Sequence, residues 1–151
     1  MKIIRSNDPI LFFSKKEKEI IEAAIRQTET RTSGEIRVHL ERKAGEDIMK
    51  HAQEKFEKLG MTQTDAHNGV LIFLGVHSKR FAILGDEGIN SKVPNGFWDG
   101  IAQDMIKEFK EDRFAEGLSQ AIQTIGSRLA EYFPYQKEDV NELPDEISYS
   151  L

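Results

Sequence analysis

The stretch "NGVLIFLGVHSKRFAILG", residues 68–85, decides the fold of this chain. Its first half is continuously apolar, which is typical of a central strand buried on both faces. The polar "HSKR" at 77–80 predicts a tight turn, and "FAILG" at 81–85 predicts the next strand. Two strands joined by so short a turn form an antiparallel hairpin.

Upstream of this hairpin the pattern predicts two helices and one strand. "FFSKKEKEIIEAAIRQTET" at 12–30 has helical spacing, and Ser14 with Glu17 forms a capping box at its start. "GEIRVHLER" at 34–42 alternates, which predicts a strand with one buried face and one face only partly buried, the latter carrying Arg37, His39 and Glu41. "AGEDIMKHAQEKFEKLG" at 44–60 predicts a second helix that ends at Gly60.

Downstream, "NGFWDGIAQDMIKEFKE" at 95–111 and "RFAEGLSQAIQTIGSRLAEYF" at 113–133 predict two further helices. The order helix, strand, helix, strand, strand, helix, helix predicts an α/β fold: a three-layer α/β/α sandwich with a small mixed central sheet and helices on both faces. We expect one domain over residues 1–135. The acidic segment 136–151 has no amphipathic stripe and is predicted to be a flexible tail.

Composition excludes several classes of function. The 151 residues carry a net charge of −5 and no basic patch interleaved with aromatic side chains, so nucleic acid is not an expected partner. The absence of cysteine excludes disulfides and thiolate metal sites. No segment reaches the roughly 20 apolar residues of a membrane span, and the N-terminal sequence lacks the pattern of a secretory leader. We therefore expect a soluble, cytoplasmic monomer.

The predicted topology brings three polar segments to one edge of the sheet. The first two strands are parallel, so both begin at that edge, and the third strand runs back and ends there. The segments are "TRTSGE" at 30–35, "TQTDAHN" at 62–68 and "GDEGIN" at 85–90. Together with the start of the next helix they supply seven candidate oxygen ligands: Asp86, Glu87, Asn90, Glu35, Asp65, Asn68 and Asp99.

Carboxylates and amides gathered in this way favour a hard divalent cation, Ca²⁺ first and Mg²⁺ second. Gly85 and Gly88 allow backbone carbonyl groups to turn inward. The alternative is ordinary turn chemistry, because Asp and Gly are common in turns. The loop lacks the spacing of an EF-hand, and the scattered histidines disfavour zinc, although His67 stays open as a ligand.

The same segments carry a family resemblance. "TRTSGEIRV" at 30–38, "HNGVLIFLGVHSKRFAILGDEGIN" at 67–90 and "VPNGFWDGIAQDMIKEFKEDRFAEGLSQAI" at 93–122 resemble the TPM domain, over residues 12–133 in all. That family is named for a thylakoid lumen protein, a photosystem II repair protein and a nematode receptor-associated protein. Its pattern includes a T-x-G-E-I strand start, an N-G-V-L-I central strand and a G-x-G-like loop.

The resemblance implies an α/β/α sandwich and divalent-cation binding, often of calcium, near the loop after the hairpin. Residue by residue it points to Glu35, Asn68, Asp86 and Asp99. Some members are described as acid phosphatases. This chain departs from the family where many relatives have a glycine-aromatic-glycine loop, because Asp86 and Glu87 stand there. Many members carry a leader and a membrane anchor, and from this sequence we expect neither.

Three hypotheses follow from these residues. The first is a cation-binding module that regulates or supports a protein partner. The second is a metal-assisted acid phosphatase in which Asp86 attacks or acts as the base. Against it, the chain has no P-loop and no DxDx motif, and of the nearby arginines Arg80 is predicted at the far end of the hairpin, leaving Arg31. The third is a scaffold whose polar edge is turn chemistry alone.

Overall fold

The computed structural model describes residues 5–43, 45–136 and 143–150. Its sheet has four strands in the order β3-β2-β1-β4. Strand β1 (Glu35–Glu41) runs parallel to β2 (Gly69–Gly75), and β2 runs antiparallel to β3 (Arg80–Gly85). The parallel pair and the antiparallel hairpin predicted from the sequence are therefore confirmed.

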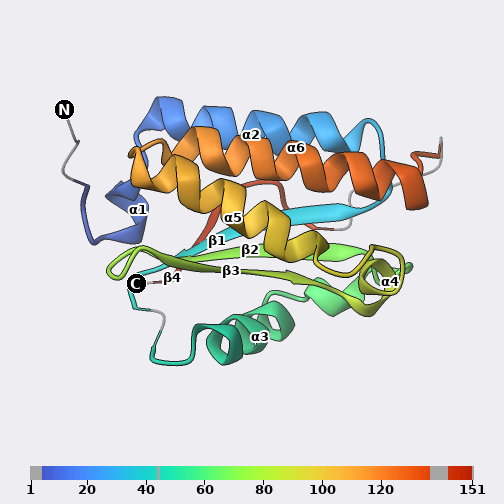
Figure 1. Cartoon of the computed structure of the whole chain (residues 1–151), viewed down its shortest axis with the longest axis horizontal. Helices are drawn as coiled ribbons and strands as arrows, with labels where there is room; N and C mark the ends of the chain where they lie inside the picture. The colour runs from blue at the N-terminus through green and yellow to red at the C-terminus, as the bar shows by residue number, and fades with distance from the viewer. Residues whose placement is uncertain (1–4, 44, 137–142, 151) are drawn as a thin grey trace.

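Helices cover both faces of this sheet (Figure 1). On one face lie α2 (Lys15–Glu29), α5 (Phe97–Lys110) and α6 (Phe114–Tyr132), with α6 packed between the other two. The opposite face is covered by α3 (Ile48–Lys58), which packs on β2 and β3. The fold is thus the predicted three-layer α/β/α sandwich with a mixed sheet, although one helix layer holds a single long helix.

Two hydrophobic cores separate the layers. The larger joins alternate residues of β1 and β2, among them Ile36, Val38 and Ile72, to the inner faces of α2, α5 and α6. The smaller lies under α3 and uses the intervening residues of β2, Leu71 and Phe73. Strand β2 is buried along its whole length, as its unbroken apolar sequence predicts.

Local signals in the sequence place several helix ends. Ser14 caps α2, and its hydroxyl accepts a hydrogen bond from the Glu17 backbone while the Glu17 carboxylate accepts one from the Ser14 backbone, at 3.1 and 3.0 Å. Gly60 follows α3 with a left-handed φ of 74°, the conformation that favours glycine after a helix. Three short helical turns were not predicted: α1 (Pro9–Phe12), η1 (Met61–Gln63) and α4 (Glu87–Asn90).

The prediction of a flexible tail is wrong for the last described segment. Ser148–Ser150 form β4, which pairs in parallel with β1 at the edge of the sheet. Leu143 and Ile147 anchor the segment because both are buried, Leu143 in the core beneath α3. Residues 137–142 and 151 of the predicted tail lie outside the described residues.

The expectation that one face of β1 is only partly buried holds for Arg37, which is half-buried, and is wrong for His39 and Glu41. His39 and Glu41 are buried, because serines of the neighbouring strand β4 contact His39 and side chains of α3 contact Glu41. His39 Nδ1 lies 2.6 Å from Ser148 Oγ, and its Nε2 lies 3.3 Å from a Glu41 oxygen. The other Glu41 oxygen contacts His51 Nε2 at 2.6 Å. This network ties β1 to α3 and to the C-terminal strand.

Among the helices that the structure describes, none combines the length and apolar character that a membrane span requires.

Candidate functional site

The three polar segments meet at one edge of the sheet, as the topology predicts. In the register Glu35 is opposite Gly69, and Val70 is opposite Gly85. Two backbone hydrogen bonds join the segments there: Glu35 N donates to Asn68 O at 3.3 Å, and Asp86 N donates to Gly69 O at 2.9 Å. The loop before β2 and the loop after β3 are therefore neighbours.

A close contact locks these two loops together. Gly88 lies in the turn α4, and a Cβ atom placed on it would overlap the carbonyl oxygen of Ala66 and lie 2.5 Å from that of His67. His67 itself has a φ of 50°, which few non-glycine residues adopt. The glycine thus allows two carbonyl oxygens to lie against the turn that starts at Asp86.

Among the predicted carboxylate ligands outside the strands, Asp86 is the least exposed, since Asp65, Glu87 and Asp99 are all exposed. Its side chain is only 12% exposed, against 48% for the neighbouring His67. One carboxylate oxygen accepts a hydrogen bond from Glu87 N at 2.8 Å and so caps α4. The other oxygen lies 3.3 Å from His67 Nδ1. The carboxylate is held in place by both loops.

Asn90 and Trp98 connect α4 to α5. Asn90 Nδ2 donates a hydrogen bond to Gly85 O at 2.8 Å, and Trp98 Nε1 donates to Asn90 Oδ1 at 2.9 Å. A Cβ atom at Gly85 would lie 2.7 Å from the Trp98 ring, so glycine is required for this packing. The Asn90 amide is therefore already occupied with holding the loop.

The remaining predicted ligands are near the edge but not gathered into one cluster. Glu35 and Asn68 are buried, and Asn68 Oδ1 has no hydrogen-bond partner among the described residues. Asp65, Glu87 and Asp99 are exposed. Within residues 5–43, 45–136 and 143–150, no three histidine, aspartate or glutamate side chains are arranged to hold a metal ion. A cation here would need amide, carbonyl and water oxygens as well.

Glu35, the first residue of β1, belongs to a second acidic group, which it forms with Glu29 and Asp145. Glu29, the last residue of α2, has its pKa raised to about 8, first by burial and then by its hydrogen bond to Asp145 and the negative charges of Asp145 and Glu35. Glu35 lies on the sheet face covered by α3, because it alternates with Ile36, which faces the larger core. The sequence did not suggest Glu29 or Asp145 as neighbours of this residue.

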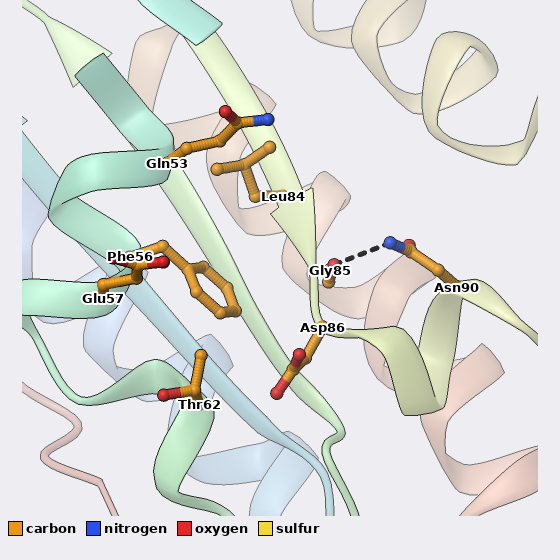
Figure 2. Close-up of a pocket in the computed structure, with 8 residues that line it drawn as sticks. All are labelled: Gln53, Phe56, Glu57, Thr62, Leu84, Gly85, Asp86 and Asn90. Atoms are coloured by element: carbon orange, nitrogen blue, oxygen red, sulfur yellow. Dashed lines mark hydrogen bonds between the residues drawn. The ribbon is translucent and has the colours of Figure 1, made fainter. Parts of the chain in front are cut away.

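A cleft of about 320 Å³ opens beside Asp86, between α3 and the end of β3 (Figure 2). In Figure 2 the Phe56 ring points into the gap toward Gly85 and Asp86, and Thr62 lies across from the Asp86 carboxylate. The sequence reasoning missed the contribution of α3 to this site. The sequence did contain a sign of this contribution, because Gln53 and Glu57 are four residues apart and so lie on one face of the predicted helix. The lining residues are Gln53, Phe56, Glu57, Thr62, Leu84, Gly85, Asp86 and Asn90.

The fold and this edge define a class: an α/β/α domain with a mixed sheet whose polar loops meet at the edge where β1 and β2 begin and β3 ends. The chain belongs to the TPM domain family, whose model matches residues 6–128. This confirms the resemblance seen in the sequence motifs. The comparison with curated proteins found no match.

Solved structures support the same assignment. The BA42 protein of the psychrophilic bacterium Bizionia argentinensis, solved by NMR, is 44% identical, with a TM-score of 0.85 over 92% of this chain and 96% of that one. The N-terminal domain of a protein from P. gingivalis is 21% identical, with a TM-score of 0.66 over 82% of each chain. The N-terminal domain of cg2496 from Corynebacterium glutamicum is 15% identical, with a TM-score of 0.59 over 89% of this chain and 79% of that one. The last two show a shared fold alone.

Proposed function

We propose that this TPM domain binds a divalent cation, Ca²⁺ in preference to Mg²⁺, at the edge around Asp86, and that it acts as a regulatory or partner-binding module. The observation that carries the proposal is the contact at Gly88. It brings the carbonyl oxygens of Ala66 and His67 against the turn that begins at the largely covered Asp86 carboxylate. Carboxylate and carbonyl oxygens are the ligands that calcium uses.

The donor set also indicates the strength of binding. Asp86 is the one largely covered carboxylate at this loop, and Glu87 is exposed. Calcium affinity falls as the number of charged ligands falls, so we expect a dissociation constant on the order of 10⁻⁴–10⁻³ M, the range of weak calcium modules. The unpartnered Asn68 Oδ1 is a further oxygen atom near this edge that a cation or its water would satisfy.

A thermal and chemical stability titration tests the proposal. With a dissociation constant of about 1 mM, 10 mM Ca²⁺ stabilises the folded state by about 1.4 kcal/mol, because it binds that state alone. Asp86→Asn keeps a helix-capping side chain and should remove most of the gain. Asp104→Asn, at an exposed position on α5, removes the same charge and should leave the gain unchanged. Equal gains in both variants would contradict a site at Asp86.

An acidic residue of the C-terminal segment, such as Asp145, would be an unsuitable control. Asp145 hydrogen-bonds with Glu29, so a substitution there changes stability directly.

The alternative function, a metal-assisted acid phosphatase, is favoured by one feature, the contact of His67 with Asp86 at 3.3 Å, which resembles an acid–base pair. The cleft beside it has no lysine or arginine among its lining residues, which disfavours a phosphate ester. Hydrolysis of a phosphate ester that requires the metal and disappears in Asp86→Asn would establish the enzyme instead of the binding module.

A further inference from the structure

The cleft beside Asp86 combines two carboxylates with an apolar floor. Glu57 of α3 and Asp86 after β3 contribute the negative charges, and the eight lining residues include no lysine or arginine. Phe56, 7% exposed, and Leu84 of β3 form the apolar part. Figure 2 shows these side chains from both walls of the gap. A metal ion at Asp86 has no use for such a floor.

The dimensions suit a small organic group. The volume of about 320 Å³ is at the lower end of the range in which proteins bind small molecules, and it exceeds the space that one hydrated ion needs. The polar side chains that line the cleft carry hydrogen-bond acceptors and come from three segments: Gln53 and Glu57 from α3, Thr62 from η1, and Asp86 from the loop after β3. A ligand with several N–H donors at one end and a short alkyl chain would match both parts.

We propose that this cleft binds a guanidinium or primary ammonium group carried on a short alkyl chain, as in the side chain of arginine or lysine. Charge-assisted hydrogen bonds from the cationic head to Asp86 and Glu57 fix its position. The methylene stem packs on Phe56 and Leu84, as the stems of long basic side chains do on apolar surface elsewhere. This ligand shares Asp86 with the proposed calcium site but does not require the metal, so the two cations compete.

The test is a titration followed by ¹H–¹⁵N NMR on the full chain, with propylguanidinium as the probe and the uncharged propylurea as its isostere. We expect saturable millimolar shifts at the amides of Thr62, Gly85 and Asp86 with the first compound only. Glu57→Gln should weaken binding roughly two- to fivefold, the effect of one partly exposed ion pair. Glu54→Gln, which removes the same charge from an exposed position on α3 that does not line the cleft, should leave binding unchanged.

Two further measurements separate the source of the ligand from the calcium proposal. A Gly-Arg-Gly peptide that binds more tightly than propylguanidinium identifies a polypeptide side chain as the ligand, and equal binding identifies a free small cation. Addition of 10 mM Ca²⁺ should weaken either one (on the order of tenfold for a calcium site of about 1 mM). Absent or non-saturable shifts, or equal binding of propylurea, would overturn this inference. Calcium binding would then stand unaffected, and guanidinium binding without calcium binding would overturn the calcium proposal alone.

Discussion

Replacing Gly88 by alanine tests the contact on which the edge site depends. The added methyl group would overlap the carbonyl oxygen of Ala66 and lie 2.5 Å from that of His67. Both obstacles are backbone atoms, and the loop that carries them is held by Asn68 N, which donates to Thr64 Oγ1 at 3.2 Å, and by the register of β2. The φ of Gly88 is not in the left-handed region, so backbone strain adds nothing to the clash.

The expected cost follows from these contacts. Overpacking in a rigid site costs about 1–3 kcal/mol, and backbone obstacles favour the upper end. Alanine regains at most about 1 kcal/mol of helical preference over glycine in α4. Gly88→Ala should therefore lower the free energy of unfolding by about 2 kcal/mol. It should also weaken the calcium response, because the two loops are pushed apart.

Gly100→Ala is the matched control. Gly100 lies in α5, and apart from the backbone of its own helix no atom comes within 4 Å of a Cβ placed there. The same substitution should raise the free energy of unfolding by about 0.5–1 kcal/mol, the usual gain of alanine over glycine inside a helix. Urea denaturation followed by circular dichroism measures both variants. A free energy of unfolding for Gly88→Ala within about 0.5 kcal/mol of the parent chain would contradict the reasoning. It would mean that the loop carrying Ala66 and His67 yields to the added methyl group.

Three further results are expected. Burial lowers the pKa of His39 to about 4, so the unfolded chain binds a proton at this residue at a higher pH than the folded chain does. The free energy of unfolding should therefore fall by up to about 3 kcal/mol as the pH drops from about 6.5 to 4. An NMR titration of His39 with a midpoint near pH 6.5 would contradict this. Burial and Asp145 raise the pKa of Glu29 to about 8, so the native chain loses stability as the pH rises from about 4.5 to 8. In urea denaturation, the free energy of unfolding of Glu29→Gln relative to the parent chain should therefore rise across that pH range. A difference that does not change with pH would contradict the raised pKa. Ile147→Ala should cost about 2–4 kcal/mol in the same assay because Ile147 is 4% exposed, whereas a flexible tail would show no change.

The parts of the fold that depend on neighbours in sequence could be predicted. The capping box at Ser14, the glycine after α3 and the unbroken apolar run of β2 are local signals, and each is present in the structure. The relative directions of β1, β2 and β3 follow from connection lengths, because a helix between two strands permits a parallel pair and a short turn requires an antiparallel one. These directions also place Asp86 at the same edge as Glu35.

The parts that depend on distant segments could not be predicted. Ser148–Ser150 are polar and few, and they form a strand only because β1 offers an open edge beside them. The burial of His39 and Glu41 depends in turn on that strand and on α3, so the alternating pattern alone suggested a face that is only partly buried. The contribution of Gln53 and Glu57 to the cleft depends on where α3 lies over β3.

The pairing of β3 with β2 also decides which loop residue enters the cleft. Along β3, Ile83 belongs to the larger core, and Gly85, two residues on, packs against Trp98 of α5 on the same face. The intervening Leu84 packs against the core beneath α3, so Asp86 emerges on that face as well. Because side chains alternate along a strand, a shift of one residue would turn Asp86 away from α3 and bring its neighbour in. The apolar pattern that buries the hairpin therefore also fixes the position of the carboxylate, and a core substitution that altered this register would abolish calcium and guanidinium binding together.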